Sequence, residues 1–318
     1  MALHKPDIVV AGAGGMGALF GAILHAGGLR VTLFDNNAEH VAAITSHGLS
    51  ITGFGGDRVV DIPATTEAGD IKRADAILVQ CKAHGTRDAA RAVRHLVDGG
   101  AICVSFQNGL GNEDVLAAEL GGDSVLGGLT AMAGMLLAPG KVRDFSRVPS
   151  YIGEMGGGIS DRATVLARAL SDAGLETHAS ADVVRDIWKK LLGNIAMSAL
   201  SGATNLTAAG CLAVPELKAT SLRALDEALA VATAHGIELD RAETVAGMEM
   251  ISEAGGTGDN KSSLCVDILN QRPSEVDFIY GSVIAKAREK GIDTPTLETL
   301  SAIVKGLESH YMPAGKDA

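Results

Sequence analysis

The first residues of the chain hold the feature that most constrains its fold. An apolar run, residues 8–11, leads directly into Gly12-Ala13-Gly14-Gly15-Met16-Gly17, and small and apolar residues at helical spacing follow. Glycines in this arrangement permit a tight turn between a strand and a helix, and they let backbone N–H groups approach a pyrophosphate at the helix N-terminus. The motif therefore predicts a dinucleotide-binding turn at the start of a doubly wound sheet, with a plain glycine turn as the alternative.

The segments after this motif alternate between strand and helix patterns. We expect strands at residues 8–11, 31–34, 76–79, 101–105 and 124–127, with helices between them at 15–26, 38–47, 86–96 and 112–119. Such alternation is typical of an α/β fold with a parallel, doubly wound sheet of the Rossmann type. Residues 49–52 and 58–60 flank a glycine-rich turn and predict a hairpin at the sheet edge. Residues 142–145 and 150–152 are expected to extend the sheet, followed by a helix at 161–173 and a strand at 176–178.

From residue 181 onward the hydrophobic period is helical almost throughout. The pattern predicts helices at 181–200, 212–234, 241–253, 262–270, 275–290 and 295–310, with glycine or proline where helices should stop. We therefore expect two domains, a dinucleotide-binding domain over residues 1–179 and an all-helical substrate and catalytic domain over 180–318. The active site is expected in the cleft between them.

The composition excludes several classes of function. A formal net charge of −11 argues against nucleic acid or an anionic membrane as the main partner. The apolar stretch 194–215 is diluted by polar residues, and the first residues lack the apolar core of a signal peptide. The cysteines are widely scattered without a CxxC pair, so we expect reduced thiols in a cytoplasmic protein and no metal site.

Asp35, at the end of the second predicted strand, bears on the choice of cofactor. A carboxylate at this position accepts hydrogen bonds from the adenosine ribose and repels a 2′-phosphate. The residues that follow, Asn36, Asn37, Ala38 and Glu39, offer no cation that could replace it. The sequence therefore favours NAD(H) over NADP(H), with an aspartate that only ends a strand as the alternative.

Two loops follow predicted strands at the edge where doubly wound sheets bind ligands. Lys82 follows the strand at 76–79, and Asn108 follows the strand at 101–105. Lys82 could meet a carboxylate or phosphate, and Asn108 could bind the nicotinamide ribose or a substrate oxygen. A solvated loop lysine remains an equal alternative for Lys82.

A lysine in the first helix of the second domain is a candidate proton donor. If residues 181–200 form one helix, Lys190, Asn194 and Ser198 share one face. Reduction of a carbonyl needs a proton donor at the ketone oxygen and groups that hold the substrate. Lys189 points elsewhere. From spacing alone, a surface lysine on an amphipathic helix remains the stronger alternative for Lys190.

Further candidates lie in two later segments. Glu275 could orient the lysine or the ribose, or it could be an acidic residue favoured in a first helical turn. Ser274 and Asp277 have the spacing of a capping box. Ser262 and Ser263 precede an apolar helix, so they could form its N-cap or bind substrate.

Taken in order along the chain, these motifs resemble the ketopantoate reductase (2-dehydropantoate 2-reductase) family. The resemblance rests on the glycine motif, Gln80-Cys81-Lys82-Ala83, residues 107–113, Trp188-Lys189-Lys190-Leu191 with Asn194, and Ser262-Ser263-Leu264 followed by residues 275–281. It covers nearly the whole chain. It implies an enzyme of pantothenate biosynthesis that transfers hydride between NAD(P)H and the 2-keto carbon of ketopantoate or a related 2-oxoacid.

The resemblance also implies roles for individual residues. Lys190 would be the proton donor and Glu275 its partner near the cofactor. Asn108 would contact cofactor and substrate, Asn194 and Ser263 would bind substrate, and Lys82 and Ala133 would lie along the cofactor. We include Ser198 among the substrate-binding candidates.

Two positions depart from the family's usual pattern. Ser198 stands where many members have asparagine, and Asp35 stands where many have a basic residue for the NADP phosphate. Both departures favour an NAD-linked dehydrogenase of another 2-hydroxy acid as an alternative within the family. A dehydrogenase of the 6-phosphogluconate type and a non-catalytic dinucleotide sensor are further alternatives. The substrate, the direction of the reaction and the oligomeric state stay open, with a homodimer among the choices.

Overall fold

The computed structural model describes residues 5–251 and 257–312 of the chain. By its internal contacts the chain divides into two compact units. The N-terminal unit comprises the residues up to Gln107 together with Asn112–Asp186, and the helical unit comprises Asn108–Gly111 and the residues from Ile187 onward. The division between the units falls after Asp186, inside a helix, and four residues of an earlier loop belong to the helical unit. The expected domains over residues 1–179 and 180–318 stay a prediction.

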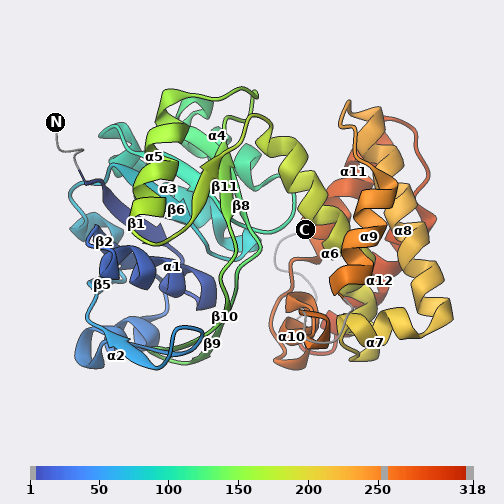
Figure 1. Ribbon diagram of the computed structural model, residues 1–318, viewed down its shortest axis with the longest axis horizontal. Coiled ribbons are helices and arrows are strands. Elements are labelled where there is room, and N and C mark those ends of the chain that lie inside the picture. Colours follow the sequence, from blue (N-terminus) through green and yellow to red (C-terminus); the bar gives the residue numbers. More distant parts are fainter. Residues whose placement is uncertain (1–4, 252–256, 313–318) are drawn as a thin grey trace. The chain divides into compact units, whose positions relative to one another are not determined.

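The main sheet of the N-terminal unit has eight strands in the order β12-β11-β8-β7-β6-β1-β2-β5 (Figure 1). All neighbouring strands pair in parallel except β11 and β8, which are antiparallel. The expected α/β fold with a predominantly parallel sheet is confirmed. The strands are β1 (Asp7–Ala11), β2 (Arg30–Phe34), β5 (Ala64–Thr65), β6 (Ala76–Val79), β7 (Ile102–Ser105), β8 (Val125–Thr130), β11 (Ser150–Gly153) and β12 (Thr177–Ala179).

Helices cover both faces of this sheet because its strands are apolar on both sides. In β1, Ile8 and Val10 belong to one buried cluster and Val9 and Ala11 to the other, as the alternation of side chains along a strand requires. The first cluster is completed by α1, α2 and α5, and the second by α3 and α4. These helices are α1 (Gly15–Ala26), α2 (Ala38–His47), α3 (Thr86–Asp98), α4 (Asn112–Leu120) and α5 (Asp161–Asp172).

A second sheet of four strands, in the order β4-β3-β10-β9, was not expected. The hairpin of β3 (Leu49–Gly53) and β4 (Arg58–Val60) forms, but it lies in this second sheet and not at the edge of the main one. β3 pairs in parallel with β10 (Lys141–Ser146), which pairs with β9 (Ala133–Ala138). Residues 142–145 therefore do not extend the main sheet, whereas residues 150–152 do.

The helical unit is formed by seven α-helices in the described residues (Figure 1). The expected helix at 212–234 is divided, because Pro215 ends one helical segment and begins the next. The expected helix at 275–290 begins with a π-helical turn, Asp277–Gly281. The α-helices are α6 (Val183–Thr204), α7 (Ala208–Ala213), α8 (Pro215–Ala234), α9 (Arg241–Ile251), α10 (Ser263–Leu269), α11 (Ser282–Glu289) and α12 (Pro295–Glu308).

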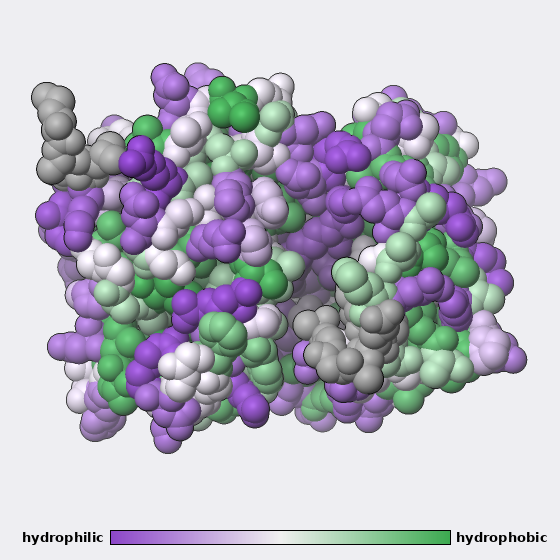
Figure 2. Space-filling model, viewed as in Figure 1, coloured by the Kyte–Doolittle hydropathy of each residue, from purple (hydrophilic) through white to green (hydrophobic). Residues whose placement is uncertain are grey.

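α6 is the helix around which the helical unit packs. Its residues Trp188, Leu192 and Ile195 are fully or nearly fully buried. A Cβ at Gly202 would lie 2.7 Å from the Leu264 side chain, so the absence of a side chain there lets α10 approach α6 closely. On the visible face of each unit hydrophilic and hydrophobic side chains are interspersed (Figure 2). Among the described residues, no helix combines the length and the apolar character needed to cross a membrane.

Candidate active site

The glycine turn between β1 and α1 is shaped by close approaches of the backbone. Gly12 has φ +95°, and a Cβ there would collide with the backbone of Cys81. A Cβ at Gly17 would collide with the carbonyl oxygen of Gly12, so the first turn of α1 can pack on the strand only without a side chain. Gly14, directly before the helix, has no atom within 4 Å of the position of a Cβ. An open space beside the N–H groups of a helix N-terminus fits the pyrophosphate of a dinucleotide.

Asp35 is joined to this turn by hydrogen bonds. Its carboxylate accepts the backbone N–H of Ala13 at 2.6 Å and that of Asn37 at 2.9 Å. Asp35 directly follows β2, and its side chain is partly exposed. The residues fit the adenosine ribose of a bound dinucleotide, because a carboxylate fixed at the end of the second strand can accept its hydroxyl groups.

His40 is a residue of this region that sequence reasoning missed. It is 1% exposed, and its Nε2 lies 2.8 Å from the carbonyl oxygen of Ala13. Its Nδ1 accepts the backbone N–H of Gly140, in the turn between β9 and β10, at 2.9 Å. With Nδ1 accepting, Nε2 carries the proton and donates to Ala13. The only sequence signal was a histidine in the first turn of a helix, which does not reveal a buried contact.

The strand β9 lies against the glycine turn. A Cβ at Gly15 would lie 2.7 Å from the backbone nitrogen of Leu136, and one at Gly134 would lie 3.2 Å from the Met16 sulfur. Ala133, expected along the cofactor, begins this strand. Lys82 directly follows Cys81, which lies against Gly12, and its side chain is partly exposed.

The loops after β6 and β7 are tied together by buried polar groups. Gln107 Nε2 donates to the carbonyl oxygen of Cys81 at 2.9 Å and to Thr86 Oγ1 at 2.7 Å. Thr86 Oγ1 lies 3.1 Å from Asn112 Oδ1. Glu113 is 5% exposed, and burial raises the pKa of its carboxyl to about 7. The sequence indicates Asn108 as a candidate in this stretch, but it does not indicate the buried contacts of Gln107, Thr86 and Asn112.

In the helical unit, three predicted residues form one chain of hydrogen bonds. Lys190 Nζ donates to Asn108 Oδ1 at 2.7 Å, and Asn108 Nδ2 donates to Glu275 Oε2 at 3.4 Å. Asn108 belongs to this unit because its segment is tied to the turn after Glu275, where Leu110 N–H donates to the carbonyl oxygen of Phe278 at 2.9 Å. Residues separated by 82 and 167 positions in the sequence are thus adjacent.

The surroundings of Lys190 change its acidity. Burial lowers the pKa of Lys190 to about 8, and the nearby carboxylate of Glu275 opposes this shift. Glu275 itself is 4% exposed. A lysine with a pKa near 8 can both give and take a proton near neutral pH, as a general acid in carbonyl reduction must.

The other predicted residues of α6 and α10 lie as follows. Lys189 is exposed and paired with Glu243, so the prediction that it points elsewhere than Lys190 is confirmed. Asn194 is partly exposed, whereas Ser198 is 3% exposed. Ser263 is exposed at the start of α10. No hydrogen bond of the side chains of Asn194, Ser198 or Ser263 links them to the Lys190 chain in the described part of the protein, and their role in binding substrate stays a prediction.

Two predicted helix caps have different outcomes. Ser262 caps α10, since its Oγ accepts the N–H of Cys265 at 3.1 Å. The capping box of Ser274 and Asp277 does not form. The N–H of Ser274 donates to Glu308 Oε1 at 2.7 Å, and Asp277 pairs with Lys305.

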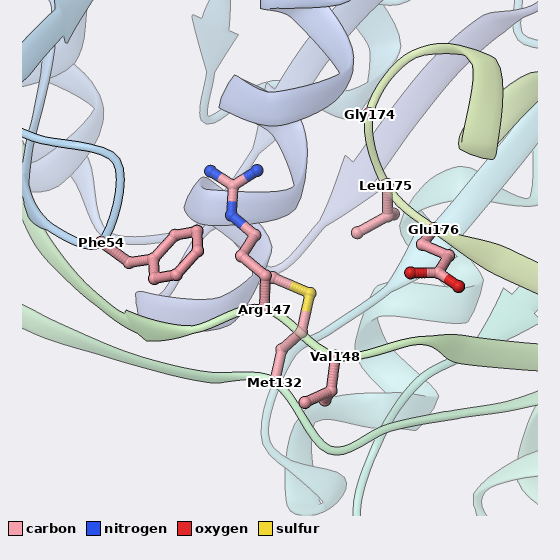
Figure 3. A pocket seen from close by; sticks show the side chains of 7 residues that line it. All are labelled: Phe54, Met132, Arg147, Val148, Gly174, Leu175 and Glu176. Carbon is pink, nitrogen blue, oxygen red and sulfur yellow. The ribbon is translucent and has the colours of Figure 1, made fainter.

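A small pocket of about 200 Å³ lies in the N-terminal unit (Figure 3). Two charged side chains line it, Arg147 and Glu176. Arg147 is paired with Asp144 at 3.1 Å, and Glu176 Oε1 lies 3.0 Å from His178 Nε2. The rest of the lining is Phe54, Met132, Val148, Gly174 and Leu175. In residues 5–251 and 257–312, no three His, Cys, Asp or Glu side chains are grouped to hold a metal ion.

Two groups of residues matter here: the glycine turn with Asp35, and the hydrogen-bonded Lys190, Asn108 and Glu275. Together with the fold, they define a nicotinamide-dependent oxidoreductase. The model of the family "Ketopantoate reductase PanE/ApbA" matches residues 8–157, and that of its C-terminal region matches residues 182–308. The chain belongs to the ketopantoate reductase family.

Relatives and solved structures agree along nearly the whole chain. The 2-dehydropantoate 2-reductase of Halobacterium salinarum is 31% identical over 94% of this chain and 97% of its own length. That of Archaeoglobus fulgidus is 32% identical over 95% and 98%. A D-mandelate dehydrogenase solved with NADH and anilino(oxo)acetate has a TM-score of 0.92 at 28% identity, covering 96% of this chain and 99% of its own. A family member from Ralstonia eutropha has a TM-score of 0.88 at 27% identity, covering 96% and 99%.

Proposed function

We propose that the protein is an NAD(H)-dependent reductase of a 2-oxoacid, either ketopantoate or a related acid. The observation that carries the proposal is the partly buried series of hydrogen bonds from Lys190 through Asn108 to Glu275, in which burial lowers the pKa of the lysine to about 8. The curated relatives named 2-dehydropantoate 2-reductase, which match over nearly their whole length, support the same reaction.

In this proposal each residue of the chain has one task. A nicotinamide cofactor bound at the glycine turn would supply the hydride that the 2-keto carbon receives. Lys190 gives its proton to the oxygen that becomes the alcohol. The side-chain carbonyl oxygen of Asn108 accepts a hydrogen bond from Lys190 Nζ and holds it in place. The side-chain N–H₂ of Asn108 donates to the Glu275 carboxylate and keeps this carboxylate near Lys190. The carboxylate favours the protonated form of Lys190, which is the form needed for reduction.

Replacement of Lys190 tests this mechanism. We expect Lys190→Ala to lower kcat for reduction by about 10²–10⁴-fold, the usual contribution of a general acid. A panel of 2-oxoacids that includes ketopantoate, followed by NADH absorbance, provides the measurement. Lys189→Ala is the matched control, since Lys189 is an exposed lysine on the same helix, paired with Glu243. Turnover of Lys190→Ala near that of the unmodified protein would refute the assignment.

The preference for NAD(H) rests on Asp35 and belongs to the proposal. The carboxylate would repel the 2′-phosphate of NADP(H). The D-mandelate dehydrogenase whose structure is similar to this protein was solved with NADH, which supports the same preference. We expect kcat/KM to be higher with NADH than with NADPH. Asp35→Asn should reduce this difference while keeping an acceptor for the N–H of Ala13, whereas Asp35→Arg should also lose that hydrogen bond. A much higher kcat/KM with NADPH for the unmodified protein would contradict the preference.

A dehydrogenase of another 2-hydroxy acid is the second candidate. It is favoured by the buried Ser198, where many family members have asparagine, and by the TM-score of 0.92 to a D-mandelate dehydrogenase. The panel distinguishes the two, because an aryl 2-oxoacid would then be preferred to ketopantoate. The hydrogen bonds that link Lys190 through Asn108 to Glu275 argue against a non-catalytic sensor. We place the protein in the cytoplasm, which its four cysteines support, since all are free thiols.

A further inference from the structure

Tyr280 makes two hydrogen bonds to the backbone of α6. Its hydroxyl donates to the carbonyl oxygen of Ile195 at 2.7 Å and accepts the N–H of Ala199 at 3.0 Å. The side chain is fully buried in the helical unit. Burial raises the pKa of Tyr280 above its usual value, so the hydroxyl keeps the proton that it donates.

The two backbone groups that Tyr280 contacts are a pair that an α-helix joins to each other. Residue 199 is four positions after residue 195, and the helical hydrogen bond runs from the N–H of one to the carbonyl oxygen of the other. The hydroxyl therefore contacts both partners of one i to i+4 backbone hydrogen bond of the helix, here called the Ile195–Ala199 rung. A side chain that enters the ladder in this way loosens the turn and redirects the part of the helix that follows.

This hydrogen-bonded pair lies between the proposed proton donor and one of the residues predicted to bind substrate. Lys190 and Asn194 come before it, whereas Ser198 lies within the turn that it closes. The carbonyl oxygen of Ser198 accepts a hydrogen bond from Ser262 Oγ at 3.2 Å, which ties the turn to the start of α10 and to Ser263. A change at the rung therefore moves Ser198 and its neighbours relative to Lys190.

The π-helical turn that holds Tyr280 also contacts the catalytic residues. It begins two residues after Glu275, whose carbonyl oxygen accepts the N–H groups of Phe278 and Ile279 at 3.0 Å each. The carbonyl oxygen of Phe278 binds the Asn108 segment through Leu110. Single π-helical turns are frequent at functional sites, because they place side chains that a regular helix would direct elsewhere.

We propose that Tyr280 is a positioning residue that determines which 2-oxoacids are accepted, because its hydroxyl on the Ile195–Ala199 rung sets the distance of Ser198 from Lys190 and Asn194. This proposal rests on the proposed function. Without the hydroxyl, the Ile195 carbonyl and the Ala199 N–H are left with the helical hydrogen bond alone. The turn then tightens, and the space between Lys190 and Ser198 for the substituent of the substrate narrows. The kcat/KM for bulky substrates then falls more than the kcat/KM for small ones.

The test compares Tyr280→Phe with the unmodified protein on a small 2-oxoacid, pyruvate, and a branched one, ketopantoate. We expect the ratio of kcat/KM for ketopantoate to that for pyruvate to fall about five- to tenfold, mainly through KM for ketopantoate, as the loss of one or two hydrogen bonds allows. The dissociation constant for NADH and the pH at which kcat/KM declines should not change. A loss of stability alone would lower activity on both substrates equally and leave the ratio unchanged.

Two further measurements keep the result decisive. Tyr311→Phe is the matched control, because its hydroxyl donates to the carbonyl oxygen of Arg272 at 3.3 Å at an exposed site. Tyr280→Met, which also lacks the hydroxyl, should shift the ratio in the same direction if Tyr280→Phe does not fold. An unchanged ratio in a folded, active variant overturns the proposal. If the unmodified protein reduces no 2-oxoacid, the proposed function fails, and the assignment of specificity fails with it.

Discussion

At the scale of single residues, the catalytic proposal depends on how an amide links two charged groups. Asn108 can satisfy both neighbours only with its carbonyl oxygen toward the Lys190 ammonium and its amide N–H₂ toward the Glu275 carboxylate. Either charge alone would be costly to bury. The orientation of Lys190 is therefore set by a residue from a distant part of the sequence.

The pH dependence of reduction follows from the pKa of Lys190. In the proposed mechanism the protonated form of Lys190 gives the proton, so kcat/KM for reduction should be constant below about pH 8 and decline above it. The Glu275 charge raises the pKa of Lys190, and Glu275→Gln should therefore move the decline to a lower pH. A pH profile of kcat/KM with a competent 2-oxoacid provides the measurement. Glu243→Gln, which removes a carboxylate paired with the exposed Lys189, should leave the profile unchanged. A decline that stays at the same pH in Glu275→Gln would exclude this coupling.

The candidate site was partly predictable at this scale. The residue types of Lys190, Asn108 and Glu275 and their order along the chain indicated the chemistry. The contacts of Gln107, His40 and Tyr280 were not predictable, since each is a hydrogen bond between residues distant in sequence. A buried polar side chain leaves no periodic signal, and only the packed fold shows its partner.

At the scale of elements, the sequence predicted the bounds of helices better than the pairing of strands that are distant in sequence. The bounds of α1 and α2 agree with the predicted 15–26 and 38–47, because a glycine turn and an Asn37 cap mark where these helices begin. The second sheet was missed because it requires the pairing of Ser50 with Lys141, across 90 residues. Strand propensity shows that a segment is extended, but it does not show which strand it joins.

The His40 contact joins three elements, α2, the glycine turn and the β9–β10 turn. Replacement by leucine leaves the carbonyl of Ala13 and the N–H of Gly140 without this partner. We expect His40→Leu to lower the free energy of unfolding by ~2–3 kcal/mol, the cost of buried groups that lose their hydrogen bonds. KM for NADH should rise, with little change in KM for the 2-oxoacid.

Urea denaturation and initial-rate kinetics measure these two effects. His47→Leu is the matched control, since His47 is an exposed histidine in the last turn of the same helix. Equal KM values for NADH in both variants would show that the contact does not hold the glycine turn in place.

At the scale of the whole molecule, two buried titratable groups act on stability in opposite directions. Burial raises the pKa of Glu113 to about 7, so between about pH 4.5 and 7 the folded state binds a proton that the unfolded state has released, and stability falls as pH rises. Burial lowers the pKa of Lys190 to about 8, so from about 8 to 10.5 the unfolded state binds the extra proton and stability rises. The combined contribution of these two groups is least favourable between about pH 7 and 8.

Replacement of Glu113 isolates the first of these effects. Relative to the unmodified protein, Glu113→Gln should gain ~2.5 kcal/mol of stability between pH 5 and pH 8, the part of the shift from 4.5 to about 7 that this pH interval spans. Urea denaturation of both proteins at the two pH values gives this difference. Asp161→Asn is the control, as an exposed carboxylate in the first turn of α5. An equal difference at pH 5 and pH 8 would contradict the prediction.

The assignment of Asn108–Gly111 to the helical unit has a consequence for recombination between family members. A chimera with a single crossover near residue 186 would take Asn108 from one parent and Lys190 and Glu275 from the other. The hydrogen bonds from Lys190 through Asn108 to Glu275 would then form only if the two parent proteins hold these side chains in the same positions. A transplant that preserves them exchanges residues 108–111 together with the residues from 187 onward, so the unit that holds the proposed catalytic residues is discontinuous in the gene.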